Sequence, residues 1–129
     1  MKTRLFTLLF LLLLTATSSL AATARNIDAR DARLLLQQKP DLFLLDVRTP
    51  QEYFEIRIDG STLIPIEQVV RRIDEIPRDR PVLVYCAVGS RSSQVAGYLA
   101  RIGYPEVYNL YGGIWGWQLR GYPVLKGAP

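Results

Sequence analysis

Cys86 is the residue of this chain best placed to do chemistry. It follows the short apolar run 82–85, which predicts a buried strand, and it precedes a segment with helical periodicity that begins near Ser92. A thiol between the end of a strand and the N-terminus of a helix feels the partial positive charge of unpaired N–H groups, and Arg91 adds a full charge. Both lower the pKa of the thiol and so raise the fraction of thiolate, the form that attacks electrophiles.

The loop between Cys86 and Arg91 is suited to anions, and its residues are Ala87, Val88, Gly89 and Ser90. The glycine allows the chain to curl so that successive backbone N–H groups point inward, which creates a pocket that prefers negative charge. The alternative is a buried cysteine that packs at the strand end as a small apolar side chain. The glycine, serine and arginine that follow Cys86 favour the reactive interpretation.

The amino-acid composition excludes several kinds of catalytic and metal site. Histidine is absent from the 129 residues and Cys86 is the only cysteine. Catalytic Ser-His-Asp and Cys-His arrangements, a Cys/His zinc site and an internal disulfide are therefore ruled out. The sequence also lacks the spacing of an EF-hand, so we expect neither a metal ion nor a cofactor. With 49% hydrophobic and 22% charged residues, the chain has the composition of one globular domain.

The N-terminal residues have the pattern of a secretory signal peptide. Lys2 and Arg4 precede the apolar run 5–14, and small residues at 19–24 offer cleavage sites. We therefore expect a signal peptide at residues 1–24, a mature domain at residues 25–129 and a periplasmic or secreted protein. An uncleaved membrane anchor stays open as the alternative, because residues 5–24 carry no charge.

The charge of the mature domain is small. The whole chain has 16 basic and 12 acidic side chains, and the loss of Lys2 and Arg4 leaves 14 against 12, a net charge of +2. The arginines at positions 71–80 are accompanied by no nucleic-acid-binding motif. We expect no nucleic-acid partner, and no stable association with the membrane once the signal peptide is removed.

Helical and strand patterns alternate along the mature chain. Helices are expected at about 28–38, capped by Asp28, and from 49 onward, where Thr49 and Glu52 match a capping box. Further helices are expected at 66–76, at 92–102 and after 112, and strands at 42–45, 63–64, 82–85 and 107–110. This order predicts a single α/β domain with a mostly parallel sheet of about five strands and helices on both faces. In such sheets the site lies at the carboxyl ends of the strands, where Cys86 falls.

At its Cys-x4-Arg spacing the loop resembles that of the rhodanese family of sulfurtransferases. Protein-phosphatase loops place five residues between cysteine and arginine instead of four, which argues against a phosphatase-like or arsenate-processing activity. Further segments resemble the family in order and spacing: 45–48 with 52–53, 58–61 with 64–65, 103–117 and 121–124.

The resemblance implies a rhodanese-like fold and a two-step sulfur transfer. Cys86 would take the outer sulfur of a donor such as thiosulfate as a persulfide and pass it to cyanide or to a thiol. The amides of loop 87–90 and Arg91 would bind the anionic donor. Arg48 is a weaker candidate for the same role, because an ion pair with a nearby carboxylate is an equally good interpretation. The alternative function is a non-catalytic module that presents a persulfide or thiol to a protein partner.

A few residues near the site depart from the family's usual pattern. Arg57 stands where the family often has histidine, Ile56 where it often has glycine, and Ala87 where it often has arginine. We expect these departures to affect substrate preference more than catalysis. Trp115 and Trp117 cannot share a helix face, so one is expected in the core and the other at the site entrance.

Overall fold

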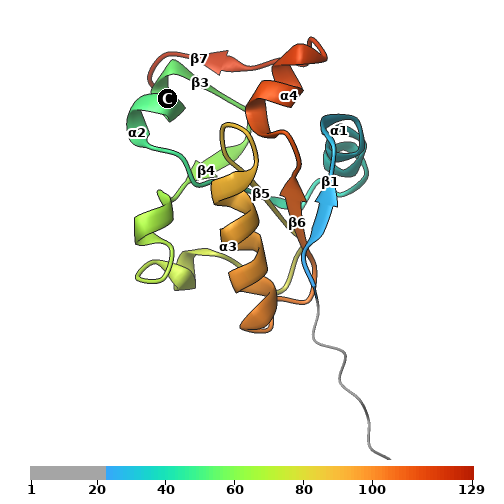
Figure 1. Ribbon diagram of the computed structural model, residues 1–129, viewed down its shortest axis with the longest axis vertical. Coiled ribbons are helices and arrows are strands. Elements are labelled where there is room, and N and C mark those ends of the chain that lie inside the picture. The colour runs from blue at the N-terminus through green and yellow to red at the C-terminus, as the bar shows by residue number, and fades with distance from the viewer. Residues whose placement is uncertain (1–22) are drawn as a thin grey trace, which may run out of the picture.

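The computed structural model describes residues 23–129 (Figure 1). The expected signal peptide lies almost entirely outside this range, so its prediction stays a prediction. Within the described part, no helix has both the length and the apolar character needed to cross a membrane.

A five-stranded parallel sheet forms the centre of the domain. Its spatial order is β1-β6-β5-β2-β4, and the strands are β1 (Arg25–Ile27), β2 (Phe43–Asp46), β4 (Ser61–Leu63), β5 (Val82–Tyr85) and β6 (Val107–Leu110). Every neighbouring pair is parallel. The predicted parallel sheet is therefore confirmed, with β5 as its central strand.

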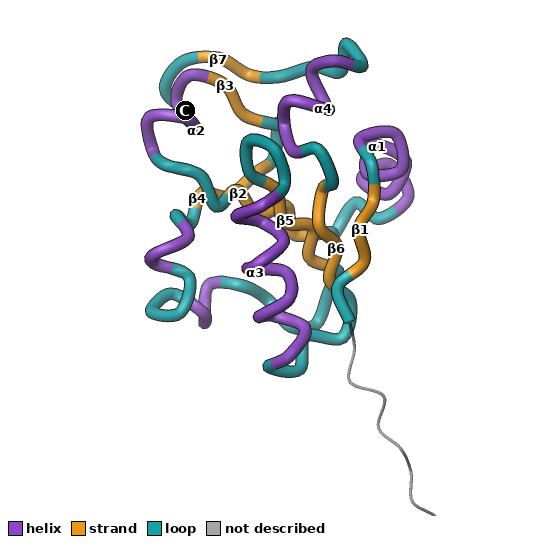
Figure 2. The backbone as a smooth tube through the Cα atoms, viewed as in Figure 1, coloured by secondary structure: helices purple, strands orange, loops and turns teal. Residues whose placement is uncertain are grey.

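Helices cover both faces of this sheet (Figures 1 and 2). Successive side chains of a strand point to opposite faces, so Val84 packs toward α3 (Ser90–Arg101) while Leu83 packs toward α1 (Ala29–Gln38) and α4 (Gly113–Leu119). Each face thus has its own buried apolar cluster. The prediction of helices on both faces is confirmed.

The prediction of one helix over residues 66–76 is wrong. The segment forms two short 3₁₀ turns, η1 (Ile66–Gln68) and η2 (Ile73–Glu75). Val69 and Ile76 are buried as the pattern indicated, but the amides of these two residues donate to carbonyls only three residues back. Prolines at both ends and β-branched residues within the segment disfavour a continuous helix.

Three strands escaped the sequence analysis because they are too short to show a period. One is the edge strand β1. The other two, β3 (Ile56–Arg57) and β7 (Leu125–Lys126), form a separate antiparallel pair that joins the C-terminal segment to the end of α2 (Pro50–Glu55). Figure 1 shows β3 and β7 side by side at the top of the domain.

The start of α2 agrees with the predicted capping box. Thr49 Oγ1 accepts a hydrogen bond from the Glu52 amide at 3.2 Å, and Glu52 Oε2 accepts one from the Thr49 amide at 2.9 Å. This reciprocal pair satisfies two amides that the helix leaves free. It also fixes the Glu52 carboxylate at the edge of the sheet where β5 ends.

The first residues of α4 pack directly on the loop that follows β5. The amide of Ile114 donates to Cys86 O at 3.0 Å, and the amide of Trp115 donates to Ala87 O at 3.1 Å. These bonds hold two loop carbonyls toward α4. A Cβ on Gly113, whose φ is +59°, would overlap the Ala87 carbonyl, so only glycine allows this close approach.

Gly113→Ala is expected to lower the free energy of unfolding by about 2–5 kcal/mol, because it combines a left-handed backbone with a clash against main-chain atoms. Gly116→Ala is the matched control in the same helix. A Cβ there comes no closer than 3.9 Å to a neighbour, and the change should be neutral or stabilising by up to about 1 kcal/mol. Urea denaturation measures both, and equal stabilities would contradict the close contact.

Candidate active site

The Cys86 sulfur is buried among hydrogen-bond donors at the start of α3. The residue is 0% exposed. Its Sγ accepts hydrogen bonds from the amides of Gly89 at 3.1 Å and Ser92 at 3.4 Å, and it lies 3.3 Å from Ser92 Oγ. The loop therefore folds back on the sulfur, as the sequence predicted, and it does so with amides that the helix leaves unpaired.

Gly89 makes this curl feasible. It precedes α3 in a left-handed conformation with φ +106°, which L side chains rarely adopt. A Cβ there would lie 3.2 Å from Gly112 N and 3.4 Å from Leu110 O. Both the backbone conformation and the crowding against the start of α4 thus favour glycine.

The surroundings of the sulfur favour the thiolate. Burial raises the pKa of Cys86, but hydrogen bonds from the Ser92 hydroxyl and from the amides of Ser92, Gly89 and Val88 outweigh it, so the pKa lies below its ordinary value. The direction agrees with the sequence prediction. Ser92 was not among the expected site residues, and its hydroxyl adds one to the site.

Arg91 faces Glu52. Its Nη1 and Nη2 bind Glu52 Oε2 and Oε1 at 2.9 and 2.8 Å, a bidentate pair between α3 and α2. Hydrogen bonds from Arg91 lower the pKa of Glu52 to about 2 against the opposing effect of burial. The guanidinium charge is near enough to Cys86 to be stabilised by it. In the sequence, Glu52 stands out as part of a capping box and of the family-like segment 52–53, but neither pattern pairs it with Arg91.

Of the two roles left open for Arg48, the structure shows the ion pair. The side chain is 3% exposed, and its Nη2 lies 2.6 Å from Asp46 Oδ2. Nη2 also donates to Ile56 O at 2.7 Å. Asp46 in turn accepts a hydrogen bond from the Arg48 amide at 2.9 Å. The Arg48 guanidinium is therefore committed to structure and is not free for a substrate.

Arg57 is occupied as well. It is buried, and it donates to the carbonyls of Tyr53 and Gly127 while its guanidinium lies over the Tyr53 ring at 5.1 Å. It thereby holds the C-terminal segment against α2. This departure from the family pattern serves packing in the structure and adds no free cation to the site.

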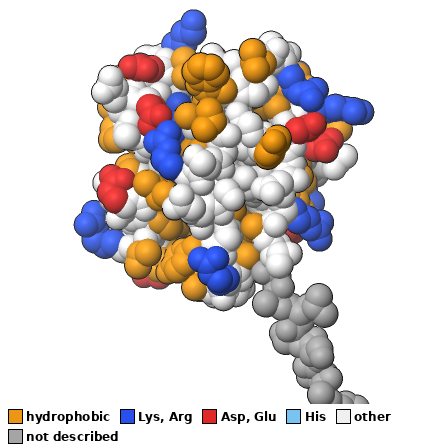
Figure 3. Space-filling view, in the orientation of Figure 1, with side chains coloured by type: hydrophobic (Ala, Val, Ile, Leu, Met, Phe, Trp, Pro, Cys, Tyr) orange, Lys and Arg blue, Asp and Glu red, His pale blue; other side chains and the backbone are white. Residues whose placement is uncertain are grey.

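The rim of the loop is apolar. Val88 is 57% exposed and Trp115 is 63% exposed, and the amide of Trp115 contacts the loop carbonyl of Ala87. Figure 3 shows apolar side chains gathered on this part of the surface, over the loop that precedes α3. Trp117 is buried and donates its Nε1–H to Pro123 O at 2.8 Å. The two tryptophans thus divide between surface and core as their spacing predicted.

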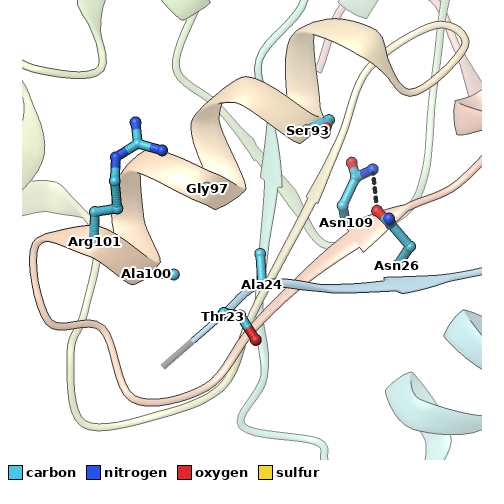
Figure 4. Close-up of a pocket in the computed structure, with 8 residues that line it drawn as sticks. All are labelled: Thr23, Ala24, Asn26, Ser93, Gly97, Ala100, Arg101 and Asn109. Atoms are coloured by element: carbon cyan, nitrogen blue, oxygen red, sulfur yellow. Dashed lines mark hydrogen bonds between the residues drawn. The ribbon is translucent and has the colours of Figure 1, made fainter. Parts of the chain in front are cut away.

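A separate cavity of about 280 Å³ lies between α3 and the edge strand β1 (Figure 4). There Asn109 Nδ2 donates to Asn26 Oδ1 at 2.9 Å, whereas the buried Asn109 Oδ1 has no hydrogen-bond partner in the described part of the chain. Neither Cys86 nor loop 87–91 lines this cavity. Across residues 23–129 no cluster of His, Cys, Asp or Glu side chains could hold a metal ion. Cys86 and its loop therefore lie apart from this cavity.

Ser92→Ala is expected to raise the pKa of Cys86 and slow its alkylation by iodoacetamide at neutral pH, because the thiolate loses a hydrogen-bond donor. The rate of alkylation against pH gives the pKa directly. Ser93→Ala is the matched control, since Ser93 is the exposed neighbour on the same helix turn. A Ser92→Ala profile that coincides with the Ser93→Ala profile would show that the hydroxyl does not support the thiolate.

Comparison with known proteins places this geometry in a family. Residues 28–120 match the family described as "Rhodanese-like domain". A protein of Allochromatium vinosum named "Sulfurtransferase" is 38% identical over 100 residues, which cover 78% of this chain and 94% of the relative. A "Thiosulfate sulfurtransferase GlpE" of Tolumonas auensis is 35% identical over 93 residues, covering 72% of this chain and 87% of that protein.

A solved structure agrees with the fold. The crystal structure of a rhodanese-related protein from Thermoplasma volcanium superposes with a TM-score of 0.71 at 34% identity, over 78% of this chain and 97% of the other. Sequence and structure thus point the same way, and the chain belongs to the family of rhodanese-like domains.

Proposed function

We propose that this protein is a sulfurtransferase that carries sulfur on Cys86 as a persulfide. The observation that carries the proposal is the buried Sγ, which accepts hydrogen bonds from the amides of Gly89 and Ser92 and lies 3.3 Å from the Ser92 hydroxyl. Such a site stabilises a thiolate and offers further amides to a second sulfur. The names of the relatives from Allochromatium vinosum and Tolumonas auensis support the same reaction class.

The first step uses a donor with a sulfane sulfur, such as thiosulfate. The Cys86 thiolate attacks the outer sulfur, an S–S bond to Cys86 forms, and the bond between the two donor sulfurs breaks. Sulfite leaves with that electron pair, and the persulfide on Cys86 keeps one negative charge. No general base is needed because the nucleophile is already anionic, which suits a chain without histidine.

The second step regenerates the Cys86 thiolate. Cyanide or a thiolate attacks the terminal sulfur, the persulfide S–S bond breaks, and thiocyanate or a new persulfide leaves. In the persulfide intermediate, amides of loop 87–91 would bind the terminal sulfur. The carbonyls of Cys86 and Ala87 are already bound by α4, so they do not point at that charge. The four-residue loop fits a single sulfur better than a phosphoryl group.

Cys86→Ser should abolish sulfur transfer, because an alcohol offers no anion at neutral pH. Intact mass spectrometry of the wild type should show one added sulfur atom after thiosulfate treatment and its loss after cyanide, with thiocyanate produced. Equal thiocyanate production by Cys86→Ser would contradict the mechanism. A wild-type mass that stays unchanged, with no turnover, would favour the alternative of a protein-binding module.

We also propose that the mature protein is periplasmic or secreted, on the pattern of residues 1–24. N-terminal sequencing of the protein recovered from the producing cells should find a start between about Ala22 and Arg25. A protein that still begins at Met1 would support the membrane anchor instead.

A further inference from the structure

We propose that Glu52 is a specificity-determining residue that makes the site favour a singly charged sulfane donor over a doubly charged one. The inference rests on the proposed sulfur transfer, because it concerns the donor of that reaction. Glu52 acts by neutralising Arg91, the one arginine of the site whose side chain is partly exposed and faces neither a buried carboxylate nor backbone carbonyls.

The position of the Glu52 carboxylate is fixed from two sides. Both of its oxygens bind the Arg91 guanidinium, at 2.8 and 2.9 Å. Oε2 also accepts hydrogen bonds from the amide and the hydroxyl of Thr49, at 2.9 and 3.0 Å. The capping box thus holds the carboxylate in place at the start of α2. A donor that binds Arg91 meets this negative charge at the same point.

The other charged side chains of the site are bound within the protein. The buried Arg48 is paired with the buried Asp46, and Arg57 is bound to backbone carbonyls. Residues 87–90 carry no charge. With Glu52 ionised, its pair with Arg91 is neutral, so the loop and its arginine carry no net side-chain charge before the Cys86 thiolate is counted. Figure 3 shows acidic and basic side chains side by side near the apolar rim.

The charge of the donor then determines how strongly the Cys86 thiolate repels it. Coulomb energy scales with the product of the charges, so the thiolate repels a dianion twice as strongly as a monoanion. A free Arg91 would offset this repulsion, and it would do so twice as strongly for the dianion. Glu52 cancels most of that offset, which leaves thiosulfate, a dianion, at a disadvantage relative to a thiosulfonate monoanion.

The helix cap alone does not require a charge at this position. Glutamine also serves as the third residue of a capping box. The pair with Arg91 is about one-third exposed on both sides, and exposed pairs add little stability. Glu52→Gln therefore keeps the cap and a hydrogen-bond acceptor for Arg91 while it removes the negative charge. This separates the electrostatic role from the structural one.

The experiment compares thiosulfate with methanethiosulfonate, which transfers the same outer sulfur but carries one charge less and releases methanesulfinate. Glu52→Gln should raise kcat/KM for thiosulfate by about tenfold and for methanethiosulfonate by about threefold, a shift of about threefold toward the dianion. Arg91→Ala should shift the ratio the opposite way, since it leaves Glu52 unpaired. Because each variant is judged by the ratio of two donors, general losses of activity cancel.

Glu55→Gln is the matched control. Glu55 lies on the same helix, is exposed, and is bonded to Gln51 rather than to Arg91, so its loss changes the net charge equally but should leave the donor ratio as in the wild type. An unchanged ratio in Glu52→Gln, or a shift toward the monoanion, would overturn the inference and make Glu52 a positioning residue for Arg91. Wild-type protein that takes sulfur from neither donor would instead refute the proposed function.

Discussion

The close approach of α4 to the loop after β5 is the constraint on which the site depends. Gly113 has no side chain, so the amides of Ile114 and Trp115 can bind the carbonyls of Cys86 and Ala87. With those carbonyls held toward α4 and Gly89 in a left-handed conformation, other amides of the loop are left to face the sulfur. Ser92, at the start of α3, also faces the sulfur through its amide and its hydroxyl. Two helices from opposite faces of the sheet thus meet at one cysteine, and each contributes polar backbone groups.

Two pairs of oppositely charged side chains lie around the Cys86 loop. Asp46 and Arg48 form a buried pair that ties β2 to the carbonyls of the chain near α2. Glu52 and Arg91 form a partly exposed pair that ties α2 to α3. A buried charge is costly unless it is paired, which explains the first pair. The pair of Glu52 and Arg91 lies where water can reach it, so we infer that its main effect is on an incoming anion. The anion-binding capacity of the site therefore comes mainly from the backbone.

Local patterns in the sequence predicted the strands Val82–Tyr85 and Val107–Leu110, the helix that begins with Asp28 as its cap, and the capping box at Thr49, because each has a signal within a few residues. The loop around Cys86 was equally visible through its glycine and its spacing. What the sequence could not show depends on tertiary contacts. The pairing of β3 with β7, the edge position of β1 and the bond between Arg91 and Glu52, 39 residues apart, follow only once the chain is folded. Residues 66–76 have a helical pattern, yet they reach the core through two turns.

The central claim is that the loop holds a second sulfur on Cys86 by its backbone. A crystal structure of the protein after treatment with thiosulfate tests this most directly. The account predicts one additional sulfur bonded to Cys86 Sγ, within hydrogen-bond distance of amides from residues 87–91, with the ion pairs of Arg48 and Arg91 in place. An unmodified Cys86, or a second sulfur that points away from the loop amides, would contradict it.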